Sequence, residues 1–223
     1  MKNLTKLVAV FVIVFSAASP SAFGQTLSTP PIQIKTYVDE TLTISATVKA
    51  DDPVTKLPTG PALGSMDHGT LVRSESTDGE HIPYALRGKA FHVFVGVNTS
   101  GRRYTLTSTM APMTSGRDTL PRALGVFGIQ ATNGQNPNPL PIGGTFAVDN
   151  TGADAVGTDK LLYTSATTGK GGVIELVYGL SGGKPKDAQG NVVLPFPGWE
   201  PVPPDQLTGH YSSSVVFTVT LLT

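Results

Sequence analysis

The residue types that could carry out catalysis occur in a familiar order near the end of the chain. Gly179-Leu-Ser-Gly-Gly183 matches the G-x-S-x-G pattern, and Asp187 or Asp205 and then His210 follow it in the order Ser, Asp, His. In such a site the serine lies on a sharp turn that leads from a strand directly into a helix. The next residues here, Lys184-Pro-Lys-Asp-Ala-Gln-Gly190, contain Pro and Gly, which break helices. We therefore interpret the motif as a Gly-rich turn after a strand, and we expect no enzyme activity.

The residues that could bind a metal ion show no suitable spacing. His68, His81, His92 and His210 form no pair such as H-x-x-x-H. Asp149, Asp154 and Asp159 share one loop, but spacing by five residues does not match a calcium-binding loop. We therefore expect no metal ion and no cofactor.

Trp199 is the only tryptophan and lies in the Pro-rich stretch Pro195–Pro204. An exposed tryptophan can stack on a sugar ring, whereas most tryptophans in such a setting cover a sheet edge or the rim of a core. Both interpretations remain open from the sequence, with the second favoured.

The first 24 residues predict a secretory signal peptide. Met1 to Lys6 is basic, Leu7 to Ala18 is apolar, and Ala22-Phe-Gly24 supplies small residues for cleavage. Cleavage after Gly24 would leave a mature chain of roughly 200 residues, which suits one large domain. The chain should therefore be exported through the periplasm.

Composition narrows the class of protein further. Lys and Arg together number 16, as do Asp and Glu, so no basic field suggests binding to nucleic acid. The chain has no cysteine, so no disulfide stabilises it after export. Gly (25) and Pro (18) are abundant and separate β-branched and aromatic runs, which indicates an all-β fold.

Period-two alternation predicts the strands that must position any site. Besides the two terminal strands described next, we expect strands at 70–73, 82–87, 91–97, 102–110, 124–132, 145–149, 161–165 and 172–180. Spacing of this kind is typical of a β-sandwich. Residues 25–39 are predicted to form a flexible or extended leader, and residues 51–69 and 182–204 to be mostly loop.

The two terminal strands have the clearest patterns. In Glu40–Lys49 the apolar row consists of Leu42, Ile44, Ala46 and Val48. In the strand that begins at Tyr211, the row consists of Val215, Phe217, Val219 and Leu221. The opposite face of this last strand is also possible as the apolar face, because a register slip of one residue exchanges the two faces.

These two strands carry a resemblance to a known family. Thr41–Val48 resembles the N-terminal donor strand of the class 5 (alpha, or CFA/I-type) fimbrial major subunits. Leu207–Leu221, with Gly209-His-Tyr211 before its alternating run, resembles the last strand of those subunits. The resemblance covers both ends of the chain, and only strand spacing supports it in the middle. The leader and the connection before the last strand are longer than is usual in that family.

The resemblance implies an incomplete immunoglobulin-like β-sandwich that lacks its final strand. It divides the chain into a signal peptide (1–24), a leader (25–39), a donor strand (40–50) and the sandwich domain (51–223). Leu42, Ile44, Ala46 and Val48 would enter a neighbouring subunit. Val215, Phe217, Val219 and Leu221 would form one wall of the acceptor groove and contact the chaperone. The donor strand would then be free of its own domain.

The partners that this resemblance implies are neighbouring copies of the chain, a periplasmic chaperone, an outer-membrane usher and a tip adhesin. The chain would be a structural subunit of a surface fimbria that supports adhesion. The alternative is a secreted monomeric β-sandwich that binds carbohydrate through Trp199 and the long loops.

Overall fold

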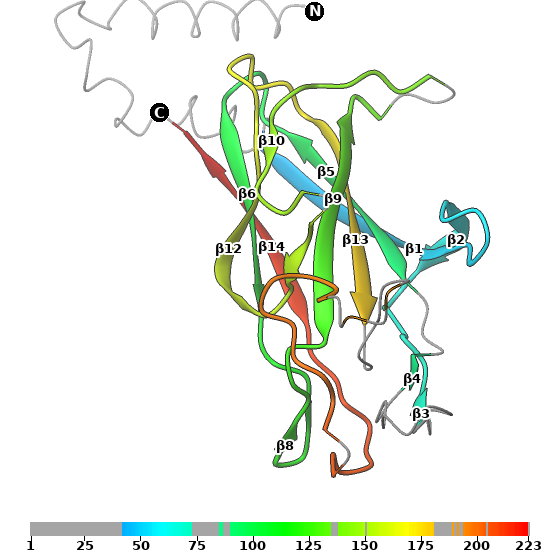
Figure 1. The fold of residues 1–223 in the computed structure, drawn as a ribbon. Coiled ribbons are helices and arrows are strands. Elements are labelled where there is room, and N and C mark those ends of the chain that lie inside the picture. The colour runs from blue at the N-terminus through cyan, green and yellow to red at the C-terminus, as the bar shows by residue number, and fades with distance from the viewer. Residues whose placement is uncertain are drawn as a thin grey trace, which may run out of the picture. The chain divides into compact units, whose positions relative to one another are not determined.

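A computed structural model describes residues 42–72, 85–86, 90–134, 138–149, 151–180, 189, 191, 194–203 and 205–222. Leu42–Thr223 forms one compact unit, while the predicted signal peptide and leader lie outside the described residues. Every regular element in the described part of the chain is a strand, as expected (Figure 1). Within the same residues, no helix is long and apolar enough to cross a membrane.

The larger sheet contains six antiparallel strands in the order β11-β9-β13-β5-β1-β2. Their bounds are β1 Thr43–Asp51, β2 Pro58–Leu63, β5 Phe91–Asn98, β9 Leu124–Thr132, β11 Ala153–Asp154 and β13 Gly172–Leu180. Strands β9 and β13 match the predicted ranges at both ends. Alternation of β-branched residues between Gly- and Pro-rich turns fixes such strands locally.

The smaller sheet contains four antiparallel strands in the order β10-β12-β6-β14. Their bounds are β6 Tyr104–Met110, β10 Thr145–Phe146, β12 Gly157–Thr164 and β14 Val215–Leu221. Two further hairpins, β3 (Leu71–Val72) with β4 (Ala85–Leu86) and β7 (Thr114–Ser115) with β8 (Asp118–Thr119), form separate two-stranded sheets.

One hydrophobic core joins the inner faces of the two large sheets. Val93, Val95 and Val97 of β5 and Ile174 and Leu176 of β13 are buried on one side. The small sheet contributes buried Tyr104, Leu106 and Leu162, together with partly buried side chains of β14. Two antiparallel sheets that share one core are consistent with a β-sandwich.

The first strand corrects an expectation. The sequence predicts that residues 40–50 stay free of their own domain, yet β1 pairs with β5 over eight consecutive positions, from Thr43 opposite Asn98 to Ala50 opposite Phe91. Strand β2 pairs with its other side. The cause is that the apolar row of β1 matches the inner face of β5, with Ile44 opposite Val97 and Val48 opposite Val93.

Candidate functional site

The two large sheets end in four edge strands, and three of them are poorly suited to pairing. Strands β10 and β11 each contain two residues, and β2 contains Pro58 and Pro61, which have no backbone N–H to donate. Short edges and prolines are standard protections against pairing with another chain. Strand β14 is different, because it has seven residues and neither proline nor charge.

Strand β14 pairs with β6 along its whole length, from Val215 opposite Met110 to Leu221 opposite Tyr104. Among the described strands β6 is its single neighbour (Figure 1). Such an edge presents backbone N–H and C=O groups in the plane of the sheet, where a further strand could pair.

The apolar row of β14 points toward the core but is incompletely covered. Val215, Phe217, Val219 and Leu221 pack against the buried cluster and are partly buried, whereas the alternate residues Val216, Thr218 and Thr220 are exposed. On the neighbouring strand β6 the inward residues Tyr104, Leu106, Ser108 and Met110 are all buried. Burial of the inward row therefore decreases at the β14 edge.

The inward side chains of β1, in the larger sheet, are incompletely buried as well. Ile44 and Ala46 lie opposite the core residues Val97 and Val95, so they point to the inner side of the sheet. Both are nevertheless exposed, Ile44 by 43%, and only Val48 is packed against the core. Side chains on the inner side of both sheets therefore remain uncovered.

Contacts between the sheets explain where the cover is missing. A Cβ at Gly128 of β9 would meet the ring of Phe146 of β10, so β10 lies close to β9. At the other end of the small sheet, the Phe217 ring of β14 lies edge-on to Tyr178 of β13, with ring centroids 6.5 Å apart. Because β14 faces β13 at Phe217, the next strands of the larger sheet, β5 and β1, lie beyond the last strand of the smaller sheet. One additional strand beside β14 would cover this region, which we call the β14 edge.

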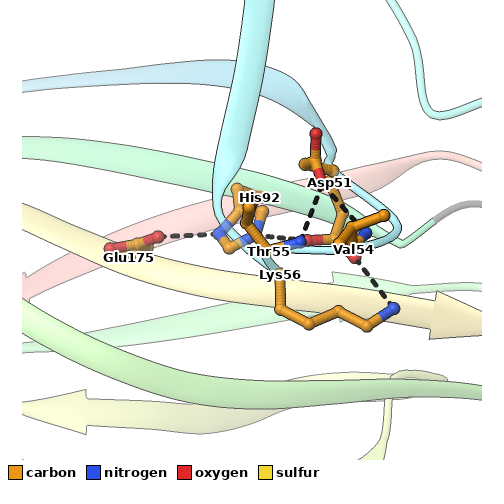
Figure 2. Close-up of polar contacts among 7 residues, drawn as sticks. Asp51, Val54, Thr55, Lys56, His92 and Glu175 are labelled. Carbon is orange, nitrogen blue, oxygen red and sulfur yellow. Dashed lines mark hydrogen bonds and ion pairs between the residues drawn. The ribbon is translucent and has the colours of Figure 1, made fainter.

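A buried polar cluster attaches the end of β1 to the middle of the same sheet (Figure 2). His92 of β5 contacts two carboxylates, with Nδ1 2.7 Å from Oε1 of Glu175 on β13 and Nε2 3.2 Å from Oδ1 of Asp51 on β1. Gln130 of β9 donates to the second oxygen of Glu175 at 2.6 Å. The exposed ammonium of Lys56 lies 3.7 Å from Asp51. Four strands thus contribute side chains to one cluster around a buried imidazole.

The cluster holds both ring nitrogens of His92 against carboxylates. Both ring nitrogens face carboxylate oxygens, and both can donate only when the imidazole is protonated. His92 and Glu175 are each 4% exposed, and removing one partner from a buried ion pair leaves an uncompensated charge. The cluster therefore stabilises the attachment of β1.

The sequence did not predict this cluster. His92 and Glu175 interrupt apolar strands, and an ionisable residue inside such a strand was the signal available; Asp51 ends its strand and gave no such signal. Pairing them requires knowledge that β1, β5 and β13 are neighbours, which the residues in each strand do not specify.

The remaining candidates come from the serine motif, the aspartate loop and Trp199. Ser181 and Asp187 lie outside the described residues, and Gly179 and Leu180 end β13. Asp149 accepts hydrogen bonds from Thr151, which keep the pKa of Asp149 below its ordinary value.

The other two aspartates of that loop have separate partners. Asp154 lies 3.4 Å from Arg122, and Asp159 lies beside Thr109. The described residues contain no group of three or more His, Asp or Glu side chains placed to hold a metal ion.

Trp199 is 6% exposed, and its backbone N–H donates to Phe196. Its ring is therefore part of a covered rim rather than a platform open to solvent.

A separate cavity of about 360 Å³ lies among the long connections. Its apolar lining includes Met113 and Leu180, and its polar lining includes His68, Gln206 and Tyr211. Tyr211 and Gln206 both donate to the carboxylate of Asp118, and the hydrogen bond from Tyr211 leads the causes that lower the pKa of Asp118. The cavity is mixed in character, as small-molecule sites are.

Comparisons of the chain with protein-family models, with curated proteins and with solved structures find no match.

Proposed function

We propose that this chain is a structural subunit of a bacterial surface fimbria and that it polymerises by donor-strand complementation. In that mechanism each subunit is an incomplete immunoglobulin-like β-sandwich, and a neighbour supplies the missing strand. The observation that carries the proposal is the β14 edge, a long strand without proline or charge whose inward row is only partly buried.

The physical reason for polymerisation is the uncovered apolar surface. A Val, Leu or Phe side chain contributes roughly 1.5–3 kcal/mol when it becomes fully buried. Phe217, Val219 and Leu221 are only partly buried, so further burial would add to the stability. The same holds for Ile44, which is exposed on the inner side of the other sheet. An added strand would also pair with the backbone of β14. Because the strand comes from another copy, each contact is head to tail and the assembly stays open.

The sequence supports the cellular setting of this proposal. The predicted signal peptide directs the chain to the periplasm. There a chaperone would cover the β14 edge until an outer-membrane usher exchanges it for the next subunit, with a tip adhesin at the end of the fimbria. The wall of the acceptor groove would be Val215, Phe217, Val219 and Leu221.

The test is the size of the purified mature chain, residues 25–223. We expect polymers or chaperone-bound chains by size-exclusion chromatography with light scattering, and thin fibres by electron microscopy. A monomer of constant mass at every concentration, with ordinary thermal stability and no fibres, would contradict the proposal.

A second candidate function is a secreted β-sandwich that binds carbohydrate. The cavity of about 360 Å³ favours it, because His68, Gln206 and Tyr211 give that cavity polar groups. Its original basis, stacking on Trp199, has little support, since that ring is buried. Calorimetric titration of the mature chain with a panel of sugars separates the two candidates. A monomer whose binding is lost in His68→Ala would favour the sugar-binding function.

A further inference from the structure

We propose that the strand which completes the β14 edge is the leader segment Ile32–Val38 of a second copy, rather than Leu42–Val48. This inference rests on the proposed function and names the segment that performs it. It begins from the position of β1, which the structure assigns to its own sheet.

Strand β1 has two sets of contacts to lose before it could serve a neighbour. Its backbone pairs with β5 on one side and with β2 on the other. Its last residue, Asp51, is hydrogen-bonded to buried His92 (Figure 2). Withdrawal of β1 would leave His92 and Glu175 buried beside an empty position, which is unfavourable for charged groups.

Strand β1 also lines the gap that must be filled. Ile44 and Ala46 are exposed on the inner side of the sheet and belong to the surface that an additional strand would cover. The same residues cannot be both the lining and the occupant within one completed sandwich.

The leader contains a second alternating segment immediately upstream. Ile32, Ile34, Thr36 and Val38 alternate with Gln33, Lys35, Tyr37 and Asp39. Four positions on one face match the four inward residues of β14, and three of the four are β-branched and apolar. A strand that enters between apolar rows needs this period-two pattern.

The length of chain that remains favours a second copy over self-insertion. Asp39, Glu40 and Thr41 are the only residues between Val38 and Leu42. The four peptide steps from Val38 to Leu42 span at most about 14 Å. Packed sheets lie about 10 Å apart. Crossing from β1 to the β14 edge would use most of this reach and leave little for reversing the chain.

Because the chain has no cysteine, disulfide trapping can test the assignment directly. Mature chains carrying Gln33→Cys, Lys35→Cys or Tyr37→Cys are each unfolded, mixed with chains carrying Thr218→Cys, refolded together and oxidised. Thr218 is on the outer face of β14 and exposed, so a strand paired there brings an outward cysteine beside it. The matched comparison is Ser45→Cys, an exposed outward position of β1, with the same Thr218→Cys partner.

We expect at least a fivefold greater yield of the disulfide dimer from the best leader position than from Ser45→Cys. A dimer from Ser45→Cys alone would overturn the segment assignment and leave polymerisation standing. A chain that carries both a leader cysteine and Thr218→Cys could instead form only an intramolecular disulfide. That result would overturn polymerisation but would keep Ile32–Val38 as the strand beside β14. Absence of every cross-link would overturn both.

Charge substitutions supply an independent measurement that does not depend on disulfide geometry. Ile34→Asp should abolish polymers seen by light scattering, because it places a carboxylate against the apolar row of β14. Thr36→Ser, on the same face of the leader, should leave their yield unchanged. Polymers that persist in Ile34→Asp would overturn the assignment.

Discussion

Phe217 lies at the point where the core meets the β14 edge. Its ring contacts Tyr178 edge-on, and the side chain is only partly buried. We expect Phe217→Ala to lower the free energy of unfolding by about 3 kcal/mol, near the lower end for a buried phenylalanine. Urea denaturation of the mature chain, followed by Trp199 fluorescence, measures this difference.

The matched control for that substitution is the next residue along β14. Val216 is 58% exposed on the opposite face, so Val216→Ala should cost under about 1 kcal/mol. Equal losses for the two variants would show that the inward and outward faces of β14 are misassigned.

The buried hydroxyls of Tyr178 and Tyr104 should make the free energy of unfolding depend on pH in alkaline solution. Burial raises the pKa of both hydroxyls above the ordinary value of 10. Above pH 10 the unfolded chain loses these protons while the folded chain keeps them, so the free energy of unfolding falls as pH rises. The stability is fully present below pH 10. Denaturation between pH 9 and pH 11 should show this slope.

Replacing the buried hydroxyl should remove part of the alkaline slope. The Tyr178→Phe variant keeps the ring but cannot ionise there, so its stability should depend less on pH above 10. Adding Tyr104→Phe should reduce the slope further, while Tyr163, whose pKa burial also raises, keeps part of it. A slope in the double variant equal to that of the parent chain would contradict this origin.

At the scale of elements, β1 is attached to its sheet by the ladder to β5 and by the cluster at His92. We expect His92→Leu to lower the free energy of unfolding by about 3–5 kcal/mol, because the buried carboxylates of Glu175 and Asp51 lose their partner. Hydrogen exchange at the amides of β1 should accelerate in parallel.

Two controls identify the charge as the cause. Lys56→Gln removes an ion pair to an exposed ammonium and should cost under about 0.5 kcal/mol. His92→Leu combined with Glu175→Leu removes the two most buried groups and leaves Asp51 beside the exposed Lys56, so it should recover part of the loss. If the double variant is less stable than His92→Leu, packing rather than charge explains the cluster.

The elements that the sequence predicted well are those whose pattern is complete in itself. Strands β9 and β13 were located to the residue because alternation and flanking glycines are local signals. Strand β2 was missed because Pro58, Gly60 and Pro61 disfavour a strand. It forms as an edge against β1, and this pairing compensates for the missing donors.

One of the two apolar rows of the candidate site was predictable from the sequence. Alternation alone put Val215, Phe217, Val219 and Leu221 on one face of the last strand, and that face lies toward the core. The neighbour of Glu40–Lys49 was not predictable, because an apolar row fits its own sheet as well as another subunit. The choice between them depends on β5 and on His92, which are distant in sequence. The role of either row in assembly remains a prediction.

For the whole molecule, the proposal predicts that one strand added to the same chain completes the sandwich without a second copy. A second copy of Ile32–Val38 is appended after Thr223 through the turn Asp-Asn-Lys-Gln, and the original leader carries Ile34→Asp. The appended strand should pair with β14 of its own chain. Its three apolar side chains contribute about 5–9 kcal/mol before ordering costs. We expect a monomer by light scattering and a higher melting temperature than that of the mature chain.

The same chain with Ile34→Asp in the appended copy as well is the matched control. It should form no polymers, and its melting temperature should stay near that of a chain with Ile34→Asp in the leader and no appended strand. If the appended strand changes neither mass nor melting temperature, the sandwich is already complete and the carbohydrate-binding alternative gains support.

The ladder between β1 and β5 has a mechanical consequence. In a linked fimbria, tension on the leader would pass through Leu42 directly into the first residue of β1. The ladder bonds lie across the strand direction, so a pull along β1 would load the pairs from Thr43 to Ala50 together rather than one at a time. The buried ion pair at Asp51 stands at the far end of that strand and would resist the last slip. In such a fimbria the joining segment would be anchored in the six-stranded sheet of the subunit that donates it, in a geometry suited to shear load.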